Sequence, residues 1–298
     1  MKIAPITLFV YNRIWHTQKT IESLQKNLFA KESDLYVYSD GPFRKEDETK
    51  VISVREYIKS ISGFKKVTLI PRKTNLGLSL SLIDGITEIV NRHQRIIVLE
   101  DDMVSSPYFL KFINEALEHY KNEEKIISIH GYIYPVRATL PETFFLKGAD
   151  CWGWATWKRG WDQFEPNGET LLAEIRKRGL EREFDFQGAY PYTKMLEEQI
   201  KGKNDSWAIR WYASAFLNDK LTLYPGRSLI RNIGTDASGT HSGDTRIYDT
   251  DLFDKPIEIS KIPIVESNFA RKEIETYLKG AKPDFLGRVK GRLFSLFQ

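Results

Sequence analysis

Three consecutive carboxylates, Glu100, Asp101 and Asp102, directly follow the apolar run from Ile96 to Leu99. A continuous apolar run of this length is typical of a strand buried on both faces of a sheet. Ligands of open α/β sheets bind just beyond the carboxyl ends of such strands. Adjacent carboxylates repel one another there, and Mn²⁺ or Mg²⁺ carrying a diphosphate would relieve the repulsion, because these cations take carboxylate and phosphate oxygens as ligands. The pattern therefore indicates either a metal and diphosphate site or a strand that ends in a solvated acidic turn.

Three other polar residues are predicted to lie at the same edge of the sheet. Arg13 follows the first predicted strand and could contact a nucleotide or lie on the surface. Asp40 follows the second strand, where it could accept a hydrogen bond from a base or ribose, or form an ordinary Asp-Gly turn. Asn75 precedes a predicted helix whose N-terminal N–H groups could face the ligand. A capping role is the alternative for Asn75.

Asp205 is a candidate general base. It lies in the polar segment from Asn204 to Trp207, immediately before a predicted helix over 207–217. An Asp in that position usually caps the helix. Transfer of a sugar to a hydroxyl group with inversion, however, requires a carboxylate that takes the hydroxyl proton. Position alone leaves both roles open.

Tryptophan is concentrated between residues 151 and 157, at Trp152, Trp154 and Trp157. An extended segment would place these rings on one face. They could form a wall on which a sugar stacks, or part of the core, and the core is favoured for Trp152 and Trp157. We regard Trp154, together with Trp207 next to Asp205, as candidate substrate contacts.

A glycine-flanked segment, Gly239-Thr240-His241-Ser242-Gly243, follows the run from Arg227 to Gly234. A lone histidine is usually structural, but a loop between glycines can close over a bound ligand. His241, Ser242 and backbone N–H groups could then contact a diphosphate. Gly, Ser, Thr and Asp are frequent throughout 224–250, which predicts a mobile loop there.

The composition is that of a globular protein: the 298 residues are 41% hydrophobic and 28% charged, with a formal net charge of +4. This mild charge argues against nucleic acid as the partner and suits an anionic small substrate. Cys151 is the only cysteine, so no disulfide within the chain is possible, which fits a reducing compartment. Neither a signal peptide nor an apolar run long enough to span a membrane is recognisable. We therefore expect a cytoplasmic location.

The first hundred residues alternate between strand and helix patterns. Strands are predicted over 6–11, 35–39, 67–70 and 96–99, and helices over 17–28, 47–61 and 79–90. This order predicts an α/β, Rossmann-like fold with a mainly parallel sheet and right-handed crossovers. The Gly-x-Gly-x-x-Gly and Gly-x-x-x-x-Gly-Lys-Ser/Thr motifs are absent, which argues against a dinucleotide-dependent dehydrogenase and a P-loop NTPase.

The second part of the chain has weaker signals. Ser106 as N-cap with Pro107 at the first helical position predicts a helix to about Tyr120. Residues 131–170 are aromatic and glycine-rich, and we expect them to be irregular. The remaining predicted elements are a strand over 126–129 and helices over 171–182 and 194–201.

Taken in order, these motifs resemble those of GT-A-fold glycosyltransferases. They are most similar to the α-mannoside β-1,2-N-acetylglucosaminyltransferase I group and its bacterial relatives, over most of residues 4–245. The resemblance is clearest at Leu99-Glu100-Asp101-Asp102-Met103. The other matching segments are Leu8 to Arg13, Ser106 to Phe112, Trp152 to Trp154, Asn204 to Trp207, and Arg227 to Gly243.

The resemblance implies a role for each matched acidic residue. Asp102 would be the sole protein ligand of a Mn²⁺ that also holds the donor diphosphate. Asp101 would contact the ribose or the donor, and Glu100 the donor sugar. Asp205 would be the catalytic base of a reaction that inverts the anomeric configuration.

The resemblance further implies that Arg13 and Asp40 contact the nucleotide, and that the loop from Thr240 to Gly243 orders when the donor binds. Two positions depart from the family. Asn204 stands where the family has a tryptophan beside the donor sugar, and residues 79–84 offer no match for its histidine near the uracil. The membrane anchor of the eukaryotic enzymes is also not recognisable.

We therefore expect a mainly parallel, mixed GT-A sheet flanked by helices, with an elaborated acceptor-side second half. The nucleotide-sugar-binding half would comprise 1–130, the acceptor-binding and catalytic half 131–250, and a C-terminal extension 251–298. The expected activity is that of a metal-dependent inverting hexosyl- or N-acetylhexosaminyltransferase. It would move a sugar from a nucleotide-sugar donor, such as a UDP-sugar, to a hydroxyl group of a glycan or lipid-linked acceptor, as in polysaccharide biosynthesis.

Two other functions are compatible with the sequence. A sugar nucleotidyltransferase also uses a carboxylate-bound metal, although no Gly-rich loop bearing Lys or Arg follows the first strand. A carbohydrate-binding protein on a transferase fold would need neither Asp102 nor Asp205. The basic and apolar residues of 282–297 predict a short amphipathic helix that either packs on its own domain or binds an anionic membrane surface. Membrane binding would place the protein peripherally on the inner membrane face.

Overall fold

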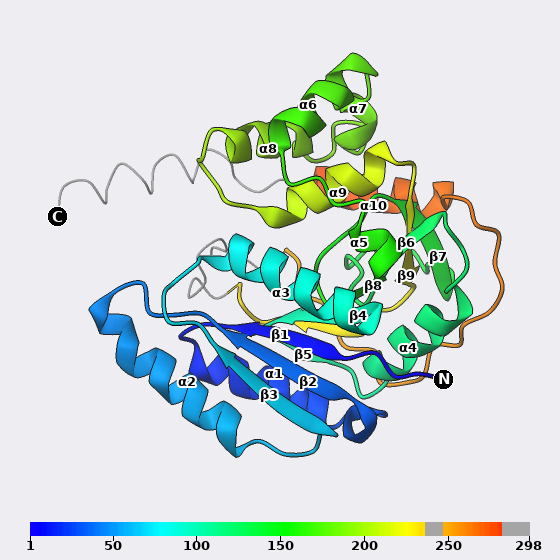
Figure 1. Cartoon of the computed structure of the whole chain (residues 1–298). Helices are drawn as coiled ribbons and strands as arrows, with labels where there is room; N and C mark the ends of the chain where they lie inside the picture. The colour runs from blue at the N-terminus through cyan, green and yellow to red at the C-terminus, as the bar shows by residue number, and fades with distance from the viewer. Residues whose placement is uncertain (236–246, 282–298) are drawn as a thin grey trace.

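In residues 1–235 and 247–281, which the computed structural model describes, an eight-stranded sheet has the order β3-β2-β1-β4-β8-β6-β9-β7. Its first four strands are parallel: β3 (Lys66–Pro71), β2 (Asp34–Ser39), β1 (Ile6–Val10) and β4 (Arg95–Glu100). Helices lie on both sides of the sheet (Figure 1). The expected α/β fold with a large, mainly parallel central sheet is confirmed.

The side chains of β1 alternate between two cores. Ile6, Leu8 and Val10 lie in one buried cluster, whereas Phe9 lies in another, on the opposite face of the sheet. The first cluster includes residues of α1 (Ile14–Gln25), α2 (Glu48–Ser60) and α4 (Phe109–His119), and the second includes residues of α3 (Leu78–His93). The three helices predicted for the first hundred residues are thus confirmed, with ends that differ by a few residues. Two short 3₁₀ turns, η1 (Ala30–Glu32) and η2 (Lys45–Asp47), complete this half.

The expectation that 131–170 are irregular is wrong. This segment contains the strands β7 (Thr143–Lys147) and β8 (Trp154–Trp157), the short helix α5 (Lys158–Trp161) and the start of α6. Strand β8 pairs antiparallel with both β4 and β6 (Ile126–His130), in the middle of the sheet. All four of its residues are buried, so its sequence lacks the polar alternation that marks a half-exposed strand.

The start of α4 and the expected loop 224–250 also differ from the predictions. The helix α4 begins at Phe109 with Tyr108, not Ser106, as its N-cap residue. The Ser106 hydroxyl accepts from the N–H of Tyr108 at 3.3 Å and donates to the carbonyl oxygen of Phe253 at 2.6 Å. The strand β9 (Leu221–Pro225) ends inside the expected loop. Within it, β10 (Ile230–Asn232) pairs antiparallel with β5 (Met103–Ser105). Residues 236–246 and the predicted tail helix over 282–297 lie outside the described residues.

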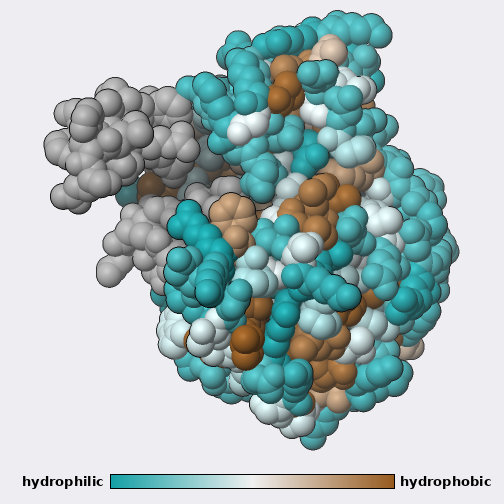
Figure 2. All heavy atoms as spheres, turned by 60° about the vertical axis from the view of Figure 1, so that its left-hand side comes forward, coloured by the Kyte–Doolittle hydropathy of each residue, from teal (hydrophilic) through white to brown (hydrophobic). Residues whose placement is uncertain are grey.

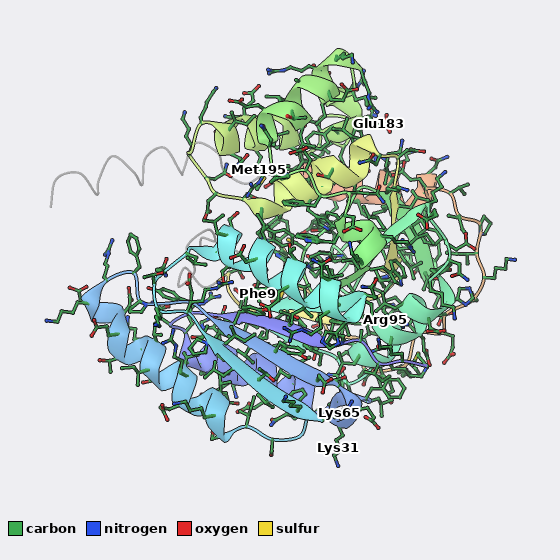
Figure 3. The ribbon with its side chains drawn as sticks, in the orientation of Figure 1. Phe9, Lys31, Lys65, Arg95, Glu183 and Met195 are labelled. Carbon is green, nitrogen blue, oxygen red and sulfur yellow. The ribbon has the colours of Figure 1, made fainter. Side chains whose placement is uncertain are left out.

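A group of helices packs around a third buried cluster and forms the upper part of the molecule in Figure 1. These helices are α6 (Gly168–Lys177), α7 (Glu181–Phe184), α8 (Tyr192–Ile200), α9 (Trp207–Leu217) and α10 (Asn268–Gly280). Figure 3 marks this layer by Glu183 and Met195, and the sheet below it by Phe9 and Arg95. Lys147 of β7 pairs with Glu183 at 2.9 Å and so joins the sheet to the helices. One sheet contains strands from both before and after residue 130. The division into functional halves at that residue stays a prediction.

The surface is that of a protein with its apolar residues mostly inside. On the face shown in Figure 2, hydrophilic residues cover most of the surface and separate the apolar patches. Of the described helices, none combines the length and the apolar character needed to cross a bilayer.

Candidate functional site

Arg13 joins the carboxyl ends of β1 and β4. Phe9 of β1 is in register with Glu100 of β4, so the residues after the two strands lie side by side. The Arg13 guanidinium donates to both Asp101 oxygens and, at 2.7 Å from Nη2, to Oδ2 of Asp102. All three side chains are largely buried, and these ion pairs are therefore shielded from water.

The acidic cluster carries more negative charge than Arg13 offsets. Burial, and then the charges of Asp102 and Asp101, raise the pKa of Glu100 to about 8. Burial also raises the pKa of Asp101 to about 6, although Arg13 acts in the opposite direction. Burial lowers the pKa of Arg13, but the two aspartates outweigh this effect and raise it above its ordinary value. This edge of the sheet can thus accept a further positive charge.

Asp102 has one carboxylate oxygen available for a ligand. Its Oδ2 bonds to Arg13, whereas Oδ1 is buried and has no hydrogen-bond partner in the described part of the chain. The backbone of Gly234 packs against the same carboxylate: a Cβ at Gly234 would lie 2.0 Å from Oδ2. The main chain of Asp102 is held by the N–H of Ile233, which donates to its carbonyl oxygen at 2.9 Å.

The residues at this edge fit a divalent cation that is held mainly by its substrate. Within 1–235 and 247–281, no group of three or more His, Cys, Asp or Glu side chains is arranged to hold a metal ion. The buried Oδ1 of Asp102, which lacks a partner, is the kind of single hard ligand that Mn²⁺ or Mg²⁺ combines with phosphate oxygens. Arg13, already paired with Asp102, would sit beside such an ion.

Asp40 and Asn75 organise the N-terminus of α3. The Asp40 carboxylate accepts from the N–H groups of Gly41, Leu76 and Gly77 at 2.9–3.0 Å. Asn75 donates to the carbonyl oxygen of Gly41 at 2.7 Å and accepts from Gly77 at 3.1 Å. Gly77, the N-cap residue of α3, has a φ of +78°, which favours glycine. Nucleotide contacts by Asp40 and Asn75 stay predictions, beside this structural role.

Asp205 lies at the same edge of the sheet. The N-cap residue of α9 is Ser206, whose hydroxyl accepts from the N–H of Ile209 at 3.3 Å, so the capping alternative for Asp205 is wrong. Oδ2 of Asp205 lies 4.0 Å from the position that a Cβ on Gly77 would occupy. The loop that Asp40 holds therefore faces Asp205. Its role as a base stays a prediction.

The predicted substrate contacts of Trp154 and Trp207 are contradicted by burial. Their side chains are 0% and 3% exposed, and the two rings stack with centroids 5.6 Å apart. Trp154 and Trp157 also lie on opposite faces of β8, in different buried clusters, because they are three positions apart in an extended strand. Trp157 belongs to the core, as favoured, and Trp152 is partly buried against it.

Two predicted residues, His241 and Ser242, lie outside the described residues.

Gly234 is the position that the sequence reasoning missed. Its N–H donates to the side chain of Asn232 at 2.7 Å, a turn that an Asn-x-Gly sequence favours. The sequence contains this local turn signal. The contact of Gly234 with Asp102, however, depends on the pairing of β10 with β5, which the sequence did not reveal.

Replacement of Arg13 by methionine should destabilise the metal-free protein by about 3 kcal/mol, because it leaves buried carboxylates without their cation. Mn²⁺ should recover part of this loss. Urea unfolding with Mn²⁺ or EDTA measures both effects. Arg92→Met, which breaks an exposed ion pair with Glu88, is the matched control and should cost less than about 1 kcal/mol. Equal losses in the two variants would contradict the assigned charge balance.

The stability of the metal-free protein should fall as the pH rises from about 5 to 8. The folded protein retains a proton on Glu100 up to about pH 8, whereas the unfolded chain releases it near the ordinary pKa of 4.5. Asp101 acts in the same direction up to about pH 6. Urea unfolding in EDTA over this pH range should show a shallower decline in Glu100→Gln than in the wild type. An unchanged slope in the variant would refute the protonation of Glu100.

Gly234→Ala should displace the Asp102 carboxylate, because the added methyl group would overlap it. Mn²⁺ affinity, measured by calorimetry with UDP present, should fall about tenfold, as for the loss of a residue that orients a metal ligand. Gly179→Ala is a control for a glycine remote from side chains, although its φ of +66° carries its own strain. Wild-type affinity in Gly234→Ala would show that the close packing is dispensable.

No protein-family model and no curated protein matches the chain. Among solved structures, residues 1–349 of S. aureus TarS are 10% identical, with a TM-score of 0.42, over 76% of this chain and 59% of that one. The same TarS segment with UDP-GlcNAc has a TM-score of 0.40 at 10% identity and covers 76% and 57%. Mannosyltransferase PcManGT from Pyrobaculum calidifontis, with GDP-Man and Mn²⁺, is 9% identical, with a TM-score of 0.31, over 43% and 35%. The chain thus spans less than two thirds of each of these proteins, and the similarity is too distant to place it in a family.

Proposed function

We propose that the protein is a metal-dependent, inverting glycosyltransferase that uses a nucleotide sugar, such as a UDP-sugar. The observation that carries the proposal is the Asp102 carboxylate at the carboxyl end of β4, with Arg13 on one oxygen and the other oxygen without a partner. The excess of negative charge around it favours a cation. The ordered motifs that resemble those of GT-A enzymes support the same function.

Asp102 would hold the Mn²⁺ or Mg²⁺ through Oδ1. When bound, the ion would neutralise the diphosphate leaving group, on which negative charge grows in the transition state. Arg13 would keep the carboxylate in place and add a second positive charge. Asp101, held by both guanidinium contacts, would contact the ribose, and Glu100 the donor sugar.

The loop from Asn75 to Gly77 would bind the nucleotide. Asp40 fixes this loop through backbone N–H groups, so the first turn of α3 is held in one orientation. The N–H groups of a first helical turn are well suited to anionic ligands. His241 and Ser242 remain proposed contacts of the diphosphate.

Asp205 would take the proton of the acceptor hydroxyl group. Its Oδ2 lies 4.0 Å from the position of a Cβ on Gly77, in the loop proposed to bind the nucleotide, and Asp205 directly precedes the N-cap residue of α9. Attack by that hydroxyl on the anomeric carbon would then displace the nucleoside diphosphate and invert the configuration. We propose a glycan or a lipid-linked sugar as the acceptor.

The donor class can be tested by thermal unfolding with a panel of UDP- and GDP-sugars, in Mn²⁺ or EDTA. A ligand that binds the folded state raises the melting temperature by mass action. We expect a Mn²⁺-dependent rise with one nucleotide sugar, and its loss in Asp102→Asn. Asp162→Asn, which alters an exposed partner of Lys158, is the control. The absence of any shift would contradict the transferase function and favour a carbohydrate-binding protein.

Asp205→Asn should separate binding from chemistry. Donor affinity should stay close to that of the wild type, while the rate of sugar transfer falls by about 10² to 10⁴-fold, as expected for loss of a general base. Release of nucleoside diphosphate with and without acceptor measures the rate. Loss of donor binding in this variant would count against the assignment of Asp205 as the base.

A further inference from the structure

Asp150 is a carboxylate that the proposed reaction does not yet use. It lies in the loop between β7 and β8 and is partly exposed. Oδ1 accepts from the N–H of Cys151 at 2.9 Å, and Oδ2 accepts from the hydroxyl group of Tyr134 at 3.2 Å. No ion pair to Asp150 occurs within 1–235 and 247–281. Its charge is therefore balanced by hydrogen-bond donors and not by a cation.

Partly buried aromatic side chains from five separate parts of the chain lie near Asp150 or contact a ring that does. They are Tyr134 after β6, Trp152 before β8, Tyr190 and Tyr192 at the start of α8, Tyr248, and Tyr277 of α10. Tyr134 packs against two of the three buried clusters and contacts Tyr248 and Tyr277 with centroids 6.3 and 6.2 Å apart. Burial, followed by the charge of Asp150, raises the pKa of both Tyr134 and Tyr192. Their hydroxyl groups thus remain protonated next to the carboxylate.

The Asp150 site adjoins the acidic cluster. Val98 of β4 is in antiparallel register with Trp154 of β8, so the residues before β8 run beside the end of β4. Burial raises the pKa of the Cys151 thiol, and the charges of Asp150, Glu100 and Asp102 add to this effect. The Cys151 side chain is therefore close enough to both the Asp150 carboxylate and the proposed donor site for their charges to affect its pKa.

A cavity of about 430 Å³ is lined by Tyr134 and by other residues of 133–140, 226–228 and 249–251. Its volume falls within the range of small-molecule sites. Its lining combines apolar residues with polar and charged ones, among them Arg137, Arg227, Ser228 and Asp249. A ligand bound at Asp150 could extend into it.

We propose that Asp150 and the aromatic side chains around it bind the acceptor as a carbohydrate, with the carboxylate accepting hydrogen bonds from sugar hydroxyl groups and the rings packing against the sugar's apolar faces. A pyranose offers hydroxyl donors at its rim and C–H groups on its faces. The hydroxyl groups are complementary to a partly exposed carboxylate without a cation, and the C–H groups are complementary to partly exposed aromatic rings. The cavity beside Tyr134 accommodates the next sugar of the acceptor. This inference rests on the proposed glycosyltransferase function and assigns its carbohydrate acceptor a binding site.

Saturation-transfer NMR on the full chain, with UDP and Mn²⁺ present, tests the proposal. The probes are the methyl α- and β-glycosides of glucose, galactose, mannose and N-acetylglucosamine. We expect at least one to bind the wild type, and its affinity to fall about tenfold in Asp150→Asn, through loss of hydrogen bonds to a charged group. Asp162→Asn should bind the glycoside like the wild type.

Thermal unfolding with UDP and Mn²⁺ separates the two sites. A preserved UDP response in Asp150→Asn, with weakened glycoside binding, supports an acceptor site distinct from the donor site. Wild-type glycoside binding in Asp150→Asn overturns the proposal, as does the absence of glycoside binding in the wild type.

If Asp150→Asn does not fold, Tyr134→Phe tests the site in its place, because it removes only the hydroxyl group. Weaker glycoside binding in this variant supports the site, and unchanged binding overturns it. Absence of a response to both UDP and GDP with Mn²⁺ in the wild type would instead refute the proposed function.

Discussion

The contact of Arg13 with Asp101 and Asp102 is the interaction on which the candidate site depends. Three consecutive carboxylates at a largely buried strand end would repel one another strongly, and Arg13 is the cation that the described structure places among them. The contact exists because β1 and β4 are adjacent and parallel, which brings the residues after both strands to one edge. The remaining excess of negative charge favours a further cation at this edge, as the proposed Mn²⁺ or Mg²⁺ site requires.

The antiparallel strand β8 determines what faces the acidic cluster. Its insertion between β4 and β6 carries the preceding loop, with Asp150 and Cys151, to the same end of the sheet. The close pairing of β10 with β5 likewise places Gly234 against Asp102. Gly234, more than a hundred residues after Asp102 in the sequence, thus completes a site whose three carboxylates are consecutive.

The first hundred residues could be predicted from the sequence because each element there carries its own signal. Turn residues such as Asp40-Gly41 end strands, and apolar stripes mark one face of α2 and α3. The second half could not be read in the same way. The buried residues of β8 show no alternation, and Ser106 carries a cap signal although its hydroxyl bonds to Phe253, 147 residues away. The acidic site could be located from consecutive residues in the sequence. The burial of Trp154 and the position of Gly234, by contrast, depend on the order of the strands in the sheet.

The loop from Asn75 to Gly77 links the two proposed binding events. Asp40 holds it from the sheet side, and Asp205 approaches Gly77 from the start of α9. Arg210, one turn further along α9, donates to the Ser79 hydroxyl at 2.6 Å and so ties α9 to the first turn of α3. A ligand that shifts this loop would therefore move the groups around Asp205 as well. Because the candidate base and the proposed nucleotide loop share these contacts, the proposed donor and acceptor positions depend on one packed unit.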